Sequence, residues 1–315
     1  MDSLIQAQRI QAISLTVTNA DRSGEFYTKA LGFEVVSDAI DGKEYVNLAA
    51  MPPSRMRIIT LKLGEERIRL KQYLDIKGKS IPLDSQSNDL WFQHLAIVVS
   101  DMDRAYAHLQ AFPIEPISTA PQTIPPGNKE AAYIQAFKFR DPDRHPLELI
   151  CFPLDKGQKK WHQKSHSLFL GIDHTAIAIA NTEQSLQFYR DRLGMQVDGG
   201  SFNWRETQAR MDGLLNAKVL ITALRPAQEG LGIELLDYIQ PADGRPIPFD
   251  LKSDDLAYVQ VELIVSDINE VVKQLQQHKL QVLPVVHLDD RGTQQGYLVQ
   301  DPTGHSILLV AEPKD

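Results

Sequence analysis

Residues 12–35 read AISLTVTNADRSGEFYTKALGFEV, and residues 174–197 read HTAIAIANTEQSLQFYRDRLGMQV. Aligned without a gap, at an offset of 162, they place Phe26-Tyr27 on Phe188-Tyr189 and Gly32 on Gly194. In each stretch an alternating apolar segment leads to an Asn and then to an amphipathic pattern, which predicts a strand followed by a capped helix. Gly194 suits the left-handed position that ends such a helix. The two stretches therefore indicate an internal duplication.

The duplication extends to the ends of the two halves. Asn88-Asp89-Leu90 matches Asp254-Asp255-Leu256 at an offset of 166, and 140–145 (RDPDRH) matches 300–305 (QDPTGH). Offsets that change by only a few residues over this length indicate duplication with small changes in the loops. The Asp-Pro pairs at 141 and 301 are turn signals that lead into a last strand.

Each half also divides in two. The repeating unit is an apolar strand, an Asp or Asn near a helix start, an amphipathic helix and three further strands. The second unit shows this as His94–Val99 followed by a helix near Met102–Ala111, and the fourth as Val259–Val265 followed by Ile268–His278. The pattern predicts an α+β protein of four βαβββ modules, with curved mixed sheets. Each pair of modules closes into a half-barrel with a cup on its concave side.

These units give the expected domain organisation. Residues 8–152 form the first domain, with modules at 8–74 and 91–152. A polar linker at 153–168 precedes the second domain at 169–313, with modules at 169–239 and 257–313. The linker carries the one local basic cluster, Lys156 to Lys164, which is interpreted as a solvated connector.

Composition narrows the class of protein. The 315 residues are 43% hydrophobic and 23% charged, as in an ordinary soluble globular protein. A net charge of -8 disfavours a nucleic-acid partner, and Cys151 is the only cysteine, so an intrachain disulfide is excluded. There is no apolar run of about 18 residues and no secretory signal, which predicts no membrane span and a cytoplasmic location.

The four-module repeat resembles the vicinal oxygen chelate superfamily of glyoxalases, bleomycin-resistance proteins and extradiol dioxygenases, over nearly the whole chain. The resemblance implies that a first-strand residue (usually His, sometimes Gln) and a last-strand Glu from each unit point into a cup and hold a divalent metal. By unit, those positions carry Ala12 and Arg69, His94 and Glu148, His174 and Glu234, and Gln260 and Leu308. Only the two middle units have complete ligand pairs.

The resemblance thus implies one divalent ion (Ni, Zn, Fe, Mn or Co) held by His94, Glu148, His174 and Glu234, with Glu148 and Glu234 as the catalytic carboxylates. Independent support comes from the apolar run around Glu148, because an isolated carboxylate taken out of water is costly unless it is paired or ligates a metal. The alternative is that all four side chains lie on half-exposed strands and face solvent. The other histidines (His108, His145, His162, His166, His278, His287 and His305) are interpreted as surface residues.

Two pairings of the modules are possible. Sequential pairing (one with two, three with four) would leave two incomplete sites. Nested pairing (two with three, one with four) would bring all four ligands into one cup, and the ligand pattern favours it. Pairing between two chains of a homodimer would complete the same set. Under nested pairing, Arg69 would fill the empty cup with a salt bridge or bind a substrate anion. Gln260 would be a remnant of a ligand position.

The expected partner is a small molecule with neighbouring oxygens. Four protein ligands suit Lewis-acid chemistry of the glyoxalase type, an isomerase, epimerase or lyase with a Glu as proton carrier. A ring-cleaving dioxygenase, which uses two His and one Glu, is the first alternative, although Leu308 at the last-strand position of the fourth unit counts against it in the C-terminal half. A metal-free binding protein of the bleomycin-resistance kind is the second.

Overall fold

A computed structural model of the chain describes residues 6–41, 54–289 and 292–312, and contains the four expected modules. Their elements, in chain order, are β1 Ala7–Thr16, α1 Ala20–Leu31, β2 Glu34–Asp41, β3 Met56–Leu63, β4 Glu66–Tyr73; β5 Gln93–Val99, α2 Met102–Leu109, β6 Glu115–Pro116, β7 Gln122–Thr123, β8 Gln135–Arg140, β9 Pro146–Cys151; the short 3-10 helix Lys159–His162; β10 Phe169–Ile179, α3 Thr182–Leu186 with its π-helical continuation Gln187–Arg192, β11 Gln196–Asn203, α4 Arg205–Asp212, β12 Lys218–Arg225, β13 Gly232–Gln240; β14 Val259–Val265, α5 Ile268–Gln277, β15 Val282–Asp289, β16 Gly292–Gln300 and β17 Ser306–Ala311.

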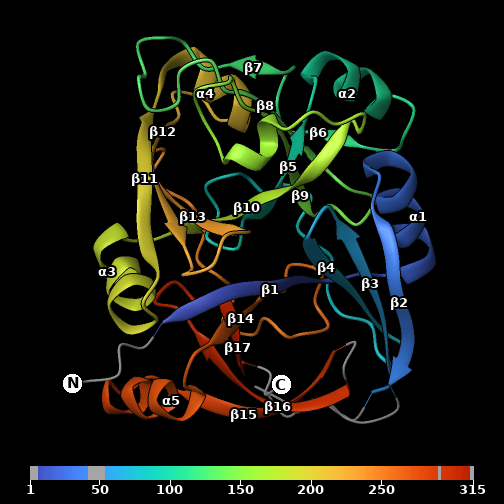
Figure 1. Ribbon diagram of the computed structural model, residues 1–315, viewed down its shortest axis with the longest axis vertical. Helices are drawn as coiled ribbons and strands as arrows, with labels where there is room; N and C mark the ends of the chain where they lie inside the picture. Colours follow the sequence, from blue (N-terminus) through green and yellow to red (C-terminus); the bar gives the residue numbers. More distant parts are fainter. Residues whose placement is uncertain (1–5, 42–53, 290–291, 313–315) are drawn as a thin grey trace.

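The modules pair in the nested way that the ligand pattern favours. One sheet has the strand order β15-β16-β17-β14-β1-β4-β3-β2 and joins the first and fourth modules. The other has the order β11-β12-β13-β10-β5-β9-β8-β6 and joins the second and third. Figure 1 shows this directly, because blue and red segments share one half of the molecule and green and yellow segments share the other. We call the concave face of the second sheet the inner cup and that of the first sheet the outer cup.

The first strands of paired modules run antiparallel and form the centre of each sheet. β5 pairs with β10, and β1 pairs with β14. On the far side of each first strand, the last strand of the same module pairs in parallel, as β9 does with β5 and β13 with β10. Each cup is therefore built around two first strands flanked by two last strands, which are the strands that carry the predicted ligand positions.

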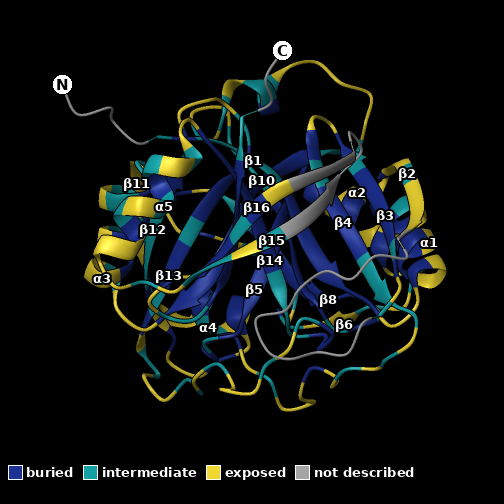
Figure 2. Cartoon of the chain, turned by 90° about the horizontal axis from the view of Figure 1, so that it is seen from below, coloured by how far each residue is buried: buried dark blue, intermediate teal, exposed yellow. Residues whose placement is uncertain are grey.

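The helices begin where the sequence predicts. Asn19, Asp101, Asn181 and Asp267 each cap a helix by accepting a hydrogen bond from a backbone N–H of the first turn. Gly194 has a φ of 70° after the third of these helices, as expected for a left-handed C-terminal position. The helices pack their apolar faces onto the convex sides of the sheets, where one large core spans both sheets. Figure 2 shows the buried strands between exposed helix surfaces.

A repeated Tyr–Asp–His corner ties consecutive modules together. The Tyr27 hydroxyl donates to Asp141, whose carboxylate also accepts from the backbone and lies 3.0 Å from Nδ1 of His145. Tyr189 and Asp301 repeat the contact in the second half. The interpretation of His145 and His305 as surface residues is therefore wrong: they are 1% and 6% exposed, and their rings contact the backbone carbonyls of Leu256 and Ala178. His287 lies outside the described side chains.

Candidate metal centre in the inner cup

Strand register brings the four predicted ligands onto one face of the inner cup. β10 pairs with β5 so that His174 lies opposite Ala96 and Ala176 opposite His94. β9 places Glu148 next to Ala96, and β13 places Glu234 next to Ala176. Because side chains in register across a sheet point to the same side, all four point into the cup.

The functional groups of the four residues are linked by a series of short contacts. His94 Nε2 lies 3.0 Å from Oε2 of Glu148, and His174 Nε2 lies 3.8 Å from that same oxygen. His174 Nε2 is also 3.3 Å from Oε2 of Glu234. The potential ligand atoms of His94, Glu148 and His174 all lie within 4.8 Å of one another. The structure thus assembles the predicted set from two modules of a single chain.

Burial and charge set the ionisation of this group. Burial lowers the pKa of His94 to about 4, so its imidazole is neutral at physiological pH. Burial opposes ionisation of Glu148, but His94, Lys138 and His174 outweigh it and lower the pKa to about 2. Burial raises the pKa of Glu234, and the neighbouring Glu148 adds to the shift. Burial lowers the pKa of His174, but Glu234, Asp173 and Glu148 outweigh it and raise that pKa. The site therefore offers the neutral imidazole of His94 and the carboxylate charge of Glu148, whereas a protonated His174 would have to release its proton to ligate a cation.

The residues fit a divalent metal ion. His174 Nε2 and His94 Nδ1 are buried ring nitrogens without a hydrogen-bond partner, and buried polar atoms in proteins rarely lack one. His174 Nε2 lies among carboxylate oxygens on the cup side, while its Nδ1 contacts Asp173. Imidazole and carboxylate together are the donor set that Zn, Fe, Ni, Co and Mn accept.

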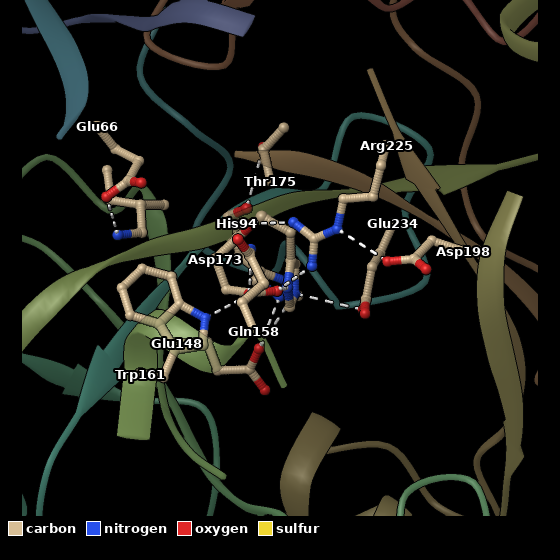
Figure 3. A network of polar contacts seen from close by, with 12 residues as sticks. Glu66, His94, Glu148, Gln158, Trp161, Asp173, Thr175, Asp198, Arg225 and Glu234 are labelled. Carbon is tan, nitrogen blue, oxygen red and sulfur yellow. Dashed lines mark hydrogen bonds and ion pairs between the residues drawn. The ribbon is translucent and has the colours of Figure 1, made fainter. Parts of the chain in front are cut away.

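Asp173, which sequence reasoning missed, holds the orientation of His174. Its Oδ2 lies 3.0 Å from Nδ1 of His174 and accepts a hydrogen bond from Arg225 at 2.8 Å. Its Oδ1 accepts from the indole of Trp161 at 2.8 Å and from Gln158 at 3.0 Å. Figure 3 shows Trp161 and Arg225 approaching Asp173 from opposite sides. The sequence feature that could have identified Asp173 is its place directly before a predicted ligand on a buried strand.

The linker is part of the cup, so its interpretation as a solvated connector is wrong. Trp161 is buried against Ala96, Val98 and Ile150, on the cup side of the sheet. Lys160 forms an ion pair with the buried Glu66 of the first module. Gly157, Gln158 and Lys159 line the cavity. An indole buried by tertiary packing gives no periodic signal in a polar segment, which is why the sequence did not reveal it.

A second buried cluster closes the other wall of the cup. Lys138 on β8, in register with Glu148, donates to Asp212 at 2.7 Å, and both side chains are at least 95% buried. Asp212 ends helix α4 and also accepts from Gln208 and Tyr238. Helix α4 interrupts the module between β11 and β12, and the repeat did not predict it. Its Gln208 and Met211 line the cavity.

The outer cup has no equivalent ligand set among the described residues. The outer sheet has the same strand register as the inner one. Ala12 lies opposite Glu262, and Leu308 lies next to Glu262. Gln260 lies opposite Ser14, and Arg69 lies next to Ser14. Arg69 and Glu262 form an ion pair in which both side chains are at most 1% exposed. Arg69 therefore follows the expected salt-bridge alternative. Gln260 accepts from Lys71 at 2.9 Å and is engaged within the protein.

The contact between Asp173 and His174 yields a testable expectation. Asp173→Asn should weaken the binding of a divalent ion by about 10- to 100-fold. The Asp173 carboxylate orients the imidazole of His174 and makes that imidazole more basic, and the substitution removes its charge. Asp198→Asn is the matched control: its carboxylate is exposed and contacts the same Arg225 at 3.4 Å, so the change in affinity should be within about twofold. Competition with a chromophoric chelator measures both. Equal affinities for the two variants would show that Asp173 has no orienting role.

Comparison with known proteins supports the fold. The family model described as the Glyoxalase/Bleomycin resistance protein/Dioxygenase superfamily matches residues 9–149 and 171–309. Glyoxalase I from Zea mays is similar in structure, with 14% identity, a TM-score of 0.60 and coverage of 96% of this chain and 92% of that one. A putative dioxygenase from Bacillus subtilis subsp. subtilis str. 168 is also similar, at 14% identity, TM-score 0.59, and 98% and 86% coverage.

No curated protein matches the chain in sequence. Among the residues that the structure describes, none of the helices has the length and apolar character needed to cross a membrane.

Proposed function

Because this chain belongs to the Glyoxalase/Bleomycin resistance protein/Dioxygenase superfamily, we propose that its inner cup binds one divalent metal ion and transforms a small molecule with two neighbouring oxygens. One observation carries the proposal. Two His and two Glu side chains from two modules converge on one face of the cup, where the buried His174 Nε2 has no hydrogen-bond partner.

The side chains suit isomerase, epimerase or lyase chemistry of the glyoxalase type. A divalent ion, when bound, supplies Lewis-acid polarisation of the substrate oxygens. Glu234 is the residue we assign to proton transfer, because its side chain is 25% exposed to the cup and burial raises its pKa towards the range that general acid–base catalysis requires. It would remove a proton from the carbon next to a carbonyl group and return it to the neighbouring atom. Asp173 keeps His174 oriented.

A ring-cleaving dioxygenase is the second candidate, and a specific observation favours it. The most compact group in the cup is His94, Glu148 and His174, which is a two-His, one-carboxylate set of the kind that non-haem iron oxygenases use. In this alternative Glu234 does not ligate and instead faces the substrate. The two candidates share the metal site and differ in their need for oxygen.

Metal content and oxygen consumption test the proposal together. Protein purified without chelators should contain about one divalent ion per chain, measured by elemental analysis. Loaded with Fe(II), Mn(II), Ni(II) or Zn(II) in turn, it would be offered hemithioacetals and catechols in an oxygen electrode. Turnover without oxygen uptake supports the isomerase or lyase, whereas stoichiometric uptake with catechols supports the dioxygenase. A chain that binds none of these ions would contradict both and leave a metal-free binding protein.

A further inference from the structure

The inner cup has the size of a small-molecule site. Its cavity measures about 750 Å³, within the range of about 300–1,000 Å³ usual for ligand pockets. Much of its wall is apolar, with the side chains of Ile134, Ile150, Phe152, Met211, Ile221 and Leu236. Such a wall favours a compact, apolar substrate body beyond the two oxygens.

The charged residues of the cavity are distributed unequally. Six carboxylates line it (Glu130, Glu148, Asp173, Asp198, Glu229 and Glu234) against four cations (Lys138, Lys159, Lys160 and Arg225). The ion-pair partners Glu66 and Asp212, just behind the wall, bring the carboxylates to eight. Glu130, Asp198 and Glu229 are exposed, so solvent screens their charge. The carboxylates that are not exposed number five against three such cations, a difference that a bound dication would cancel.

Three of the four cations are already held by carboxylates. Lys138 pairs with Asp212, Lys160 with Glu66, and Arg225 with Asp173 and Asp198. The fourth, Lys159, is exposed, so solvent screens its charge. An anionic group on a substrate would lose its hydration in the cup and gain no unpaired buried cation among the described residues.

Resting on the proposed function, we infer that the inner cup selects uncharged substrates: molecules with two neighbouring oxygens and an apolar body, without a carboxylate or phosphate. An anionic substituent would lose its hydration beside cations that are already paired with carboxylates, and this cost disfavours charged competitors. The metal site recognises the oxygens, and the wall rejects the charge.

A pair of probes that differ only in charge tests this inference. 3,4-Dihydroxybenzamide and 3,4-dihydroxybenzoate share two adjacent hydroxyls and nearly the same shape, but only the second carries a carboxylate. Binding to the Zn(II)-loaded protein, measured without oxygen by calorimetry, should favour the benzamide by at least about tenfold, because the carboxylate of the benzoate would lose hydration without gaining an unpaired cation. This readout does not depend on turnover.

The Asp212→Asn variant sharpens the test, because it removes the carboxylate that holds the Lys138 ammonium. The preference for the benzamide should then shrink severalfold, mainly through tighter binding of the benzoate. If this variant does not fold, the wild-type comparison is decisive on its own. Equal affinities, tighter binding of the benzoate, or no binding of either probe to metal-loaded protein would overturn the inference and leave the metal site intact. Failure to bind metal at all would instead overturn the proposed function, and the inference with it.

Discussion

Replacing His174 with alanine is expected to abolish divalent-metal binding at micromolar concentrations, with a loss in affinity of more than about 100-fold. The removal of a residue that only orients a ligand already costs about 10- to 100-fold, so the loss of the ligand itself should cost more. His174 is the strongest choice among the four residues, because its Nε2 has no hydrogen-bond partner and lies 3.3 and 3.8 Å from two carboxylates. His94→Ala should behave in the same way.

Internal symmetry supplies the control. Gln260 occupies in the fourth module the first-strand position that His94 occupies in the second, but it lies in the outer cup and is engaged by Lys71. Gln260→Ala should therefore leave metal stoichiometry and affinity unchanged. Elemental analysis after dialysis gives the stoichiometry, and chelator competition gives the affinity. If His94→Ala and His174→Ala both retain wild-type affinity, the ion is bound elsewhere and the inner cup is not a metal centre.

The repeat was readable from sequence because it depends on local chemistry. Caps such as Asn181, the turn at Asp301-Pro302 and alternating apolar strands are local signals, and the structure has the expected helices and strands at these places. The nested pairing was also predictable, although strand order is a non-local property. The reason is that a metal site needs its ligands together, so the positions of His94, Glu148, His174 and Glu234 carried information about which modules share a sheet.

The features that the sequence did not reveal depend on tertiary packing. Trp161 reaches Asp173 only because the linker folds back over the cup, and Lys138 reaches Asp212 only because α4 is inserted between two strands. A polar or basic residue in such a segment has the same local pattern whether it is solvated or buried. Glu262 differs from these residues because its position has a local signal in the sequence. Gln260 and Glu262 alternate within an apolar strand and so share the face that points into the outer cup.

Glu262→Gln is expected to lower the free energy of unfolding by about 3–5 kcal/mol, because it breaks a buried ion pair by removing the charge of one member. Both side chains are at most 1% exposed, so solvent cannot compensate for the loss. The pair occupies the centre of the outer cup, where the register equivalent of Glu262 in the inner cup is Ala96. Denaturant unfolding followed by tryptophan fluorescence measures the change.

Two further variants separate burial from charge. Glu312→Gln breaks a partly exposed ion pair, in which the side chains of Arg9 and Glu312 are 29% and 39% exposed, and should cost no more than about 1 kcal/mol.

The double replacement Arg69→Met with Glu262→Leu removes both charges and should recover most of the stability lost in Glu262→Gln, because an apolar pair of similar volume avoids the cost of desolvation. If Glu262→Gln costs less than about 1 kcal/mol, the ion pair is not what fills the outer cup. If the double variant is as unstable as the single one, hydrogen bonds to other groups outweigh the pairing of the two charges. The expected pattern would mean that a charge pair fills the outer cup and stabilises the sheet, with Arg69 at the position that Glu234 occupies in the inner cup.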